Sequence, residues 1–166
     1  MYNINRVIKK LTPHRSAAEL FKYFSDEKDC VFLDSSLVNG LGRYSIIGVR
    51  PYLKLVKDDH GFFINEQKVS ELSFEEYLKK YMSEHKDQNK GGLPMLSGAI
   101  GYFSYEYGRK LMEIPSHKEN LVTIPDAVLV FYDMYIIEDC HEKKTFLVAN
   151  GVTEDAEKLI ESVEKR

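Results

Sequence analysis

The hydrophobic residues of this chain follow a strand-like alternation more often than a helical repeat. Short runs rich in β-branched and aromatic residues, bounded by polar residues or glycine, are typical of strands. Such runs occupy residues 2–10, 29–36, 43–49, 52–59, 62–69, 96–105, 126–139 and 144–150. Turn signals at Asp59–Gly61 and at Cys140–Lys143 lie between consecutive runs. The pattern therefore predicts hairpins arranged as an antiparallel meander.

Three segments have the helical repeat, and each begins near a residue suited to capping a helix. Ser16 with Glu19, and Ser73 with Glu76, have the spacing of a capping box. Thr153 is the candidate N-cap of the third helix. The apolar stripes of the three helices are Ala17, Leu20, Phe21 and Phe24; Phe74, Tyr77, Leu78, Tyr81 and Met82; and Ala156, Leu159, Ile160 and Val163. Each stripe is expected to pack against a sheet.

These elements define the expected fold class. Strands outnumber helices and cluster as hairpins, so we expect an α+β fold whose largely antiparallel β-sheets pack as a sandwich with flanking helices. A chain of 166 residues is long enough to bury a core, and residues 1–166 are expected to form a single domain. The charged, glycine-ended stretch at residues 83–92 is expected to be a solvated loop.

The composition is that of an ordinary globular protein, with 43% hydrophobic and 30% charged residues. A formal net charge of −3 gives no electrostatic reason to expect a nucleic-acid partner or an anionic membrane. No run approaches the roughly 18 apolar residues of a membrane span, and the first ten residues lack the apolar block of a secretory signal. Cys30 and Cys140 stand alone, so a reduced, cytoplasmic setting is expected.

The stretch SGAIGYFSYEYGRK, residues 97–110, combines three glycines with four aromatic residues. Gly98, Gly101 and Gly108 match neither the dinucleotide-binding fingerprint nor the Walker loop, which argues against a phosphate site. Two interpretations remain open. The glycines can let another backbone come close at a tightly packed sheet crossing, or the aromatic rings can form a pocket wall over them. Gly108 is expected to end a short helical turn.

No catalytic or metal-binding constellation stands out in the sequence. None of the histidines is followed by a second ligand three or four residues later; they are His14, His60, His85, His117 and His141. Cys140 and His141 are adjacent in a turn, where their side chains are expected to point apart. Asp133, Glu138 and Asp139 lie along a strand pattern and are expected to be edge or solvent-face charges.

A more suggestive group of residues flanks the loop between the second and third strand runs. Asp34 and Ser35 end one strand, and the chain returns through Gly42, Arg43 and Tyr44. A carboxylate suits an ammonium group, whereas a hydroxyl, backbone N–H groups near a glycine and a guanidinium suit a carboxylate. Together they match an amino-acid zwitterion. The alternative is a surface ion pair between Asp34 and Arg43, with Ser35 in a turn.

Three stretches, in this order, resemble the N-terminal domain of the chorismate-utilising synthases: FLDSS…GRYSIIGVRP, SGAIGYFSYEYGRKLMEIP and IPDAVLVFYDMYIIED. This family comprises component I of anthranilate synthase and of aminodeoxychorismate (para-aminobenzoate) synthase. Its pattern is a strand ending in Leu-(acid or His)-Ser, then Gly/Ser-Arg-(Phe/Tyr), a glycine-rich aromatic motif, and Pro-Asp followed by a Tyr-Asp strand. Each motif alone is weak, but their succession over roughly residues 16–150 is specific.

The resemblance implies a non-catalytic, ligand-binding or structural domain. In the family, a larger C-terminal domain binds chorismate and Mg²⁺ and performs the amination, with ammonia from a separate glutamine amidotransferase subunit. This chain would end before that domain begins, so it would hold no catalytic residue, no metal ligand and no cofactor. Its expected partners are the C-terminal domain of the same protein and the amidotransferase.

Within the family, GYFSYEYGRK and PDAVLVFYD resemble the aminodeoxychorismate branch, which serves para-aminobenzoate and folate synthesis. The compact loop between Ser35 and Arg43 points the same way, since anthranilate enzymes often carry a longer insertion there. One alternative is the regulatory domain of anthranilate synthase component I, with feedback by tryptophan. Another, of a different class, is a free-standing small-molecule binding module.

The family holds a tryptophan pocket in this domain, which the resemblance transfers to Asp34, Ser35, Leu41, Gly42, Arg43 and Tyr44. Ser35 matches the pocket serine, and the residues from Leu41 to Tyr44 match the returning loop. Asp34 stands where anthranilate enzymes have a glutamate that can meet the ligand's ammonium group, and it is one methylene shorter. L-Tryptophan is therefore the candidate ligand, with the rest of the pocket wall supplied by the catalytic domain. Residues 97–110 are expected to form a central strand and turn around this pocket.

Overall fold

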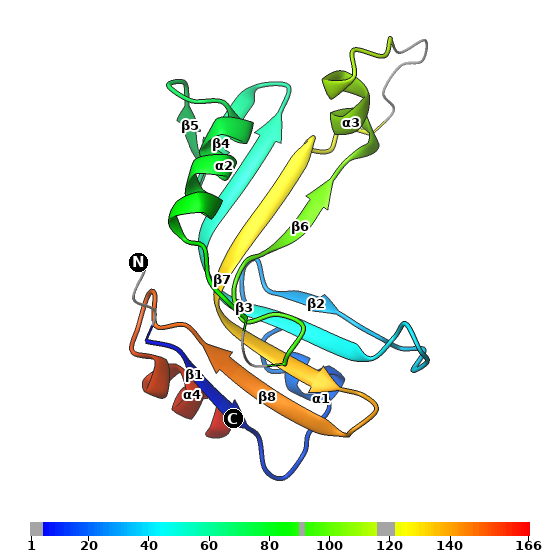
Figure 1. The fold of residues 1–166 in the computed structure, drawn as a ribbon, viewed down its shortest axis with the longest axis vertical. Coiled ribbons are helices and arrows are strands. Elements are labelled where there is room, and N and C mark those ends of the chain that lie inside the picture. Colours follow the sequence, from blue (N-terminus) through cyan, green and yellow to red (C-terminus); the bar gives the residue numbers. More distant parts are fainter. Residues whose placement is uncertain (1–4, 90–91, 116–121) are drawn as a thin grey trace. The chain divides into compact units, whose positions relative to one another are not determined.

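The computed structural model describes residues 5–89, 92–115 and 122–166 (Figure 1). The chain forms two compact units. The first comprises Met1–Tyr52, Asp87–Gly98 and Phe131–Arg166, and the second comprises Leu53–Lys86 and Ala99–Val130.

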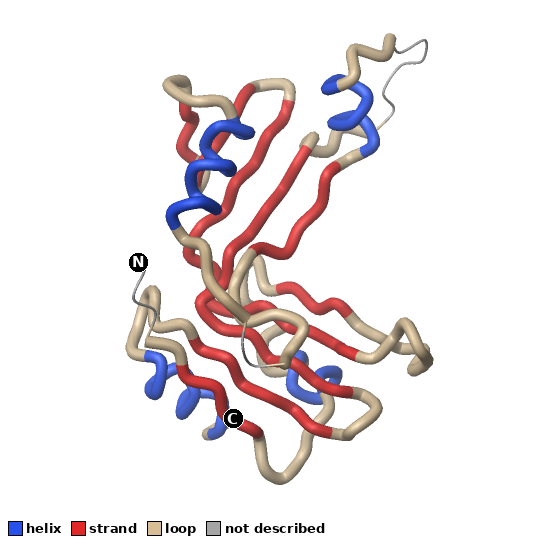
Figure 2. Tube along the Cα trace, viewed as in Figure 1, coloured by secondary structure: helices blue, strands red, loops and turns tan. Residues whose placement is uncertain are grey.

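The described residues contain eight strands and four helices (Figures 1 and 2). The strands are β1 (Val7–Lys10), β2 (Val31–Leu33), β3 (Tyr44–Asp58), β4 (Gly61–Ile64), β5 (Gln67–Val69), β6 (Ala99–Phe103), β7 (Ala127–Asp139) and β8 (Lys144–Ala149). The helices are α1 (Ala17–Phe21), α2 (Phe74–Glu84), α3 (Tyr105–Leu111) and α4 (Ala156–Glu164). Hydrogen bonds connect the strands in the order β1-β8-β7-β3-β4-β5, with β2 paired to β3 and β6 paired to β7.

The strand pairing confirms the α+β class with antiparallel strands. The ladders β1–β8, β2–β3, β3–β4, β4–β5 and β7–β8 are all antiparallel. The hydrogen bonds join the eight strands into one sheet, which differs from the separate sheets of the expected sandwich. The difference arises because β3 and β7 are 15 and 13 residues long and contribute to both compact units.

Helix α4 packs against β1 and β8 in the first unit (Figure 1). Its predicted stripe is confirmed, since Ala156, Leu159, Ile160 and Val163 are all buried. They join a core that includes Leu147 and Ala149 of β8 and Leu20 of α1. Each fully buried aliphatic side chain of this kind stabilises the fold by about 1.5–3 kcal/mol.

Two of the three predicted helix caps are confirmed. The capping boxes of Ser16 with Glu19 and of Ser73 with Glu76 both form. The third prediction is wrong, because Asp155 rather than Thr153 caps α4 and accepts the N–H of Lys158. The helix begins at Ala156, so Thr153 lies two residues before the N-cap position, and its hydroxyl donates to Asp133.

An aromatic cluster forms the core of the second unit. Phe74, the first residue of α2, is fully buried. Its ring lies 5.6 Å from that of Phe62 in β4, 6.3 Å from that of Phe103 in β6 and 6.2 Å from that of Tyr107 in α3. Edge-to-face pairs of this kind add to the burial of apolar area. The cluster therefore ties α2, α3 and the two strands together.

Three boundaries differ from the sequence predictions. The two strands expected at residues 43–49 and 52–59 are one strand, β3, because the alternation of buried residues keeps its phase across Arg50 and Pro51. The single strand expected at residues 62–69 is the hairpin β4–β5, which turns at Asn65 and Glu66 with φ angles of 47° and 71°. The first strand begins at Val7 in the described structure, and residues 2–4 of its predicted range lie outside the described residues.

Gly101 supports the sheet-crossing interpretation of the glycine-rich stretch. A Cβ atom at this position would lie 1.9 Å from the carbonyl oxygen of Val128 in β7. The glycine thus permits close backbone approach, as the sheet-crossing interpretation predicts. The expectation of a central strand is wrong, because among the described strands β6 pairs only with β7. Gly108 lies inside α3 and does not end it.

Candidate functional site

The predicted ligand residues lie on the loop that connects β2 to β3. The first two, Asp34 and Ser35, are bonded to the beginning of β3. The Ser35 N–H donates to the Ser45 hydroxyl oxygen at 2.9 Å, and the Ser45 hydroxyl donates to Asp34 Oδ1 at 3.1 Å. The Ser35 hydroxyl donates to the Tyr44 carbonyl oxygen at 2.7 Å. Asp34, Ser35 and Tyr44 are thus brought together, as the resemblance predicts.

The tip of the loop is shaped by Asn39. Its side-chain oxygen accepts the N–H groups of Leu41 and Gly42 at 2.8 and 2.9 Å. Gly42 is required here, since a Cβ atom would lie 2.3 Å from the Leu37 carbonyl oxygen. The expectation that the N–H groups near Gly42 are exposed for a ligand is therefore wrong. The Leu41 side chain points outward and is 98% exposed.

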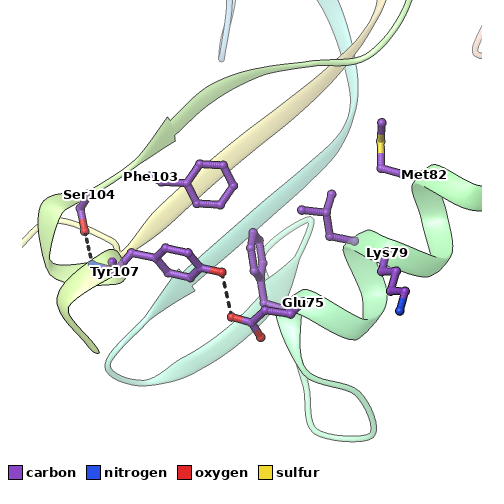
Figure 3. A pocket seen from close by; sticks show the side chains of 9 residues that line it. Glu75, Lys79, Met82, Phe103, Ser104 and Tyr107 are labelled. Atoms are coloured by element: carbon purple, nitrogen blue, oxygen red, sulfur yellow. Dashed lines mark hydrogen bonds between the residues drawn. The ribbon is translucent and has the colours of Figure 1, made fainter. Parts of the chain in front are cut away.

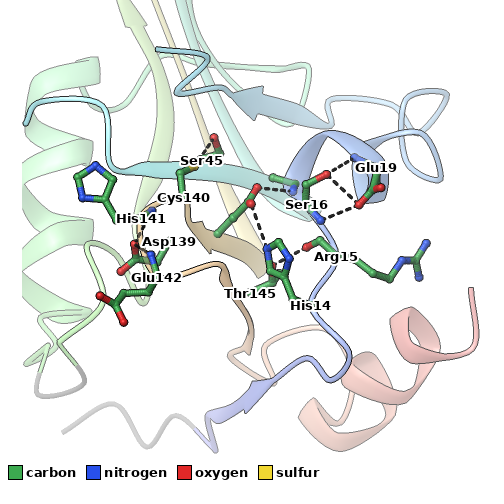
Figure 4. A network of polar contacts seen from close by, with 12 residues as sticks. His14, Arg15, Ser16, Glu19, Ser45, Asp139, Cys140, His141, Glu142 and Thr145 are labelled. Atoms are coloured by element: carbon green, nitrogen blue, oxygen red, sulfur yellow. Dashed lines mark hydrogen bonds and ion pairs between the residues drawn. The ribbon is translucent and has the colours of Figure 1, made fainter. Parts of the chain in front are cut away.

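Arg43 is paired with Asp139, at the end of β7. Its Nε and Nη2 atoms donate to Asp139 Oδ2 at 3.0 and 2.6 Å. The Asp139 side chain is only 7% exposed, and its Oδ1 accepts the N–H groups of His141 and Glu142 at 3.1 and 3.0 Å (Figure 4). The hydrogen bonds from Arg43 hold the pKa of Asp139 below its usual value. The alternative of an Asp34–Arg43 ion pair is thereby excluded.

Ser45, Asn39 and Asp139 were missed as members of this site. Asn39 is followed by a glycine, which is a recognisable turn signal. Ser45 and Asp139 had no such signal, because their roles depend on the pairing of β3 with distant parts of the chain. Ser45 is buried and its hydroxyl oxygen lies 3.6 Å from the Cys140 sulfur.

The acidic residues of β7 are buried, which corrects the expectation of solvent-face charges. Asp133 is fully buried and accepts the N–H groups of Val152 and Thr153 and the Thr153 hydroxyl. Glu138 is 5% exposed and accepts the Ala17 N–H at 2.7 Å, with His14 Nε2 at 3.1 Å (Figure 4). These carboxylates fasten the loop before α4 and the start of α1 to the sheet, so their role is structural.

The cysteines and histidines form no reactive pair among the residues described. Burial raises the pKa of the Cys30 thiol to about 11, with a further contribution from Glu27. Cys140 faces Ser45, whereas the His141 ring contacts the Asn39 carbonyl oxygen at 3.1 Å, so the two neighbours point apart. The described residues include no group of three or more His, Cys, Asp or Glu side chains that could hold a metal ion. His117 lies outside the described residues.

The second unit contains an apolar groove of about 510 Å³ between α2, β6 and α3 (Figure 3). It is lined by Phe74, Glu75, Leu78, Lys79, Met82, Phe103, Ser104, Tyr107 and Gly108. The Tyr107 hydroxyl donates to Glu75 at 3.0 Å, and burial together with this carboxylate raises the pKa of Tyr107 to about 12. Two of the four aromatic residues of the glycine-rich stretch, Phe103 and Tyr107, therefore line a hollow, which does not include Asp34 or Arg43.

Lys110, the last residue of the glycine-rich stretch, also forms ion pairs. Lys110 Nζ donates to both oxygens of the buried Asp126 at 2.9 Å and to Asp59 at 2.6 Å. These bonds tie α3 to the start of β7 and to the β3–β4 turn. The ammonium group is consequently paired with two carboxylates within the fold.

Comparison with known proteins finds similarity to component 1 of two synthases. It is 32% identical over 138 residues, or 79% of its length, to anthranilate synthase component 1 of Acetivibrio thermocellus. It is 35% identical over 52 residues, or 31% of its length, to aminodeoxychorismate synthase component 1 of Klebsiella aerogenes. The chain is a homologue of component I of the chorismate-utilising synthases. The predicted resemblance to the N-terminal region of these synthases is thus confirmed.

The similarity to component I extends to the fold. The structure superimposes on anthranilate synthase component I from Streptococcus pneumoniae TIGR4 with a TM-score of 0.60, over 98% of this chain and 36% of that one. At 22% identity this match shows a shared fold. The chain spans only 28% of the Acetivibrio component I and 11% of the Klebsiella one. No family model matches the chain, and no helix in its described part is long and apolar enough to cross a membrane.

Proposed function

We propose that this chain is the N-terminal, non-catalytic region of a chorismate-utilising synthase component I. The observation that carries the proposal is the similarity to anthranilate synthase component 1 over 79% of the chain. The site chemistry supports it, because the acids that could serve catalysis in β7 accept hydrogen bonds that hold the fold together. The partners of this region would be the chorismate- and Mg²⁺-binding catalytic domain and a glutamine amidotransferase subunit.

The direct test is an activity assay of the 166-residue chain with chorismate, Mg²⁺ and ammonia. We expect no consumption of chorismate, whereas the complete gene product assayed in parallel should consume it. Turnover by the 166-residue chain alone would overturn the proposal. Inactivity of the complete gene product would point instead to a free-standing binding module.

The comparisons favour the anthranilate branch for the product, which was the alternative on the sequence alone. The match to the Acetivibrio anthranilate synthase covers 138 residues, whereas the match to the Klebsiella aminodeoxychorismate synthase covers 52. The compact loop between Ser35 and Arg43 remains the argument for aminodeoxychorismate as the second candidate. Mass spectrometry of the product formed from chorismate by the complete gene product distinguishes anthranilate from 4-amino-4-deoxychorismate.

We further propose that the loop from Asp34 to Tyr44 binds an amino acid, with L-tryptophan as the candidate. Asp34 Oδ1 accepts the Ser45 hydroxyl, and Oδ2 has no partner among the described residues, so the carboxylate can still accept an ammonium group. Ser35 is held beside it by Tyr44 and Ser45. Calorimetric titration of the complete gene product with L-tryptophan tests this site, and the absence of a binding signal would contradict it.

A further inference from the structure

We propose that Asp139 is a positioning residue for the amino-acid site: it holds one edge of the Arg43 guanidinium so that the other edge can receive a ligand carboxylate. This inference rests on the proposed amino-acid site. It concerns a residue outside the β2–β3 loop, since Asp139 lies at the end of β7.

The bonding pattern of Arg43 leaves three of its five N–H donors available. A guanidinium has five N–H donors in a fixed plane. Nε and Nη2 each use one donor on Asp139 Oδ2, at 3.0 and 2.6 Å. The two donors of Nη1 and the second donor of Nη2 have no partner among the described residues. Because the Arg43 side chain is 46% exposed, this edge is accessible and has the geometry for a bidentate bond to a carboxylate.

Asp139 is itself held rigidly, which is what a positioning role requires. Its other oxygen, Oδ1, accepts the N–H groups of His141 and Glu142. The Cys140 N–H donates to the Arg43 carbonyl oxygen at 2.8 Å, so the main chain of Arg43 is bonded to the same turn. The guanidinium carbon also lies 5.0 Å from the centre of the Tyr44 ring. A side chain fixed in this way loses less rotamer entropy when it binds a ligand.

The start of β3 also holds Asp34, whose carboxylate would receive the ligand's ammonium group. Ser45 bonds Asp34, and Tyr44 bonds Ser35. Asp34 would therefore contact the ammonium group, and Arg43 the carboxylate. The negative charge of Asp139 also opposes a ligand carboxylate, but solvent screening weakens that repulsion at an exposed edge. We accordingly expect the positioning effect to dominate.

The test compares two ligands that differ by one carboxylate, L-tryptophan and tryptamine, on the complete gene product. Isothermal titration is carried out on the wild type, Asp139→Asn, Arg43→Ala and the double variant. Asp139→Asn is expected to weaken L-tryptophan binding by roughly tenfold and to leave tryptamine binding unchanged. The double variant should bind L-tryptophan no more weakly than Arg43→Ala alone, because Asp139 acts through Arg43.

Two further variants keep the test decisive. Glu142→Gln is the matched control, since Glu142 lies in the same turn with a side chain 56% exposed and has no bond to Arg43 from its carboxylate. It should bind both ligands as the wild type does. Arg43→Lys keeps the charge but replaces the planar fork of donors with a single ammonium group, so it should lose L-tryptophan affinity selectively even if Asp139→Asn does not fold.

The possible outcomes distinguish the role of Asp139 from the existence of the amino-acid site. Unchanged L-tryptophan binding in Asp139→Asn, or equal weakening for tryptamine, would overturn the role of Asp139 and leave the amino-acid site standing. If the wild type binds no L-tryptophan, the amino-acid site fails, and the role of Asp139 fails with it.

Discussion

Individual glycines in this chain have opposite roles that only their surroundings reveal. A side chain at Gly101 would meet the Val128 carbonyl oxygen, whereas an added Cβ at Gly108 meets nothing within 4 Å. The sequence places both in one glycine-rich stretch and predicts the close approach. It could not predict which glycine makes that approach, because Val128 is 27 positions away and the register of β6 on β7 is a tertiary property.

Replacing these two glycines by alanine should therefore shift stability in opposite directions. Gly101→Ala is expected to lower the free energy of unfolding by about 1–3 kcal/mol, since β6 and β7 must move apart. Gly108→Ala, inside α3, should raise it by roughly 0.5–1 kcal/mol through helix propensity. Urea denaturation of both variants measures the difference. Equal effects would show that the predicted contact with Val128 is not formed.

The ion pair between Arg43 and Asp139 predicts a specific acid sensitivity. The pKa of Asp139 is lower in the folded chain than in the unfolded chain, where an aspartate titrates at about 3.9. The folded state then binds fewer protons, so the stabilisation is complete above the unfolded pKa and is lost as the pH falls through the folded pKa. Asp139→Asn should remove this part of the pH dependence, which lies near and below the unfolded pKa of about 3.9, in urea titrations. An identical pH dependence in the variant would contradict the assignment.

At the scale of elements, the sequence predicts helix starts better than strand boundaries. The boxes at Ser16 and Ser73 depend on residues three positions apart, and both form. Asp155 caps α4 because the helix begins at Ala156, whereas Thr153 lies two residues earlier and donates to Asp133, a contact across 20 positions. The strand patterns identify β7 and β8 correctly but divide β3, since Pro51 resembles a boundary whenever pairing is unknown.

Glu138 provides the test at this scale, because it fastens α1 to the sheet. Glu138→Gln should lower the free energy of unfolding by about 1.5–3 kcal/mol, as a buried acceptor of the Ala17 N–H loses its charge. The control is Glu161→Gln, an acid 60% exposed whose ion pair with Lys165 contributes little. Chemical denaturation of both variants compares them, and equal destabilisation would argue against a structural role for Glu138.

On the scale of the whole molecule, the two compact units each have a core that can be weakened separately. Phe74→Ala in the second unit and Leu159→Ala in the first each remove a fully buried side chain, at a cost of about 2–5 kcal/mol. Hydrogen exchange should rise mainly in β4 and β5 for the first variant and in β1 and β8 for the second. A uniform rise in both units for either variant would show that the chain unfolds as one cooperative unit.

The ordered motifs predicted the family of the whole chain but not its branch. The order of the motifs is a property of the entire sequence, and the comparisons confirm the family that this order predicted. These motifs do not fix the branch, since the chain is similar to component 1 of both an anthranilate synthase and an aminodeoxychorismate synthase. The loop residues of the candidate site could be predicted because they lie close together in the sequence. Asp139, which bonds Arg43 from β7, was expected to face the solvent.

Leu41 stands at the tip of the loop that carries the candidate site, and its side chain is 98% exposed. Only its main chain is needed by the turn, through the bond to Asn39. Mutations of the Leu41 side chain are therefore expected to change the free energy of unfolding very little. The residue at this position can therefore be exchanged while the scaffold beneath the loop stays the same.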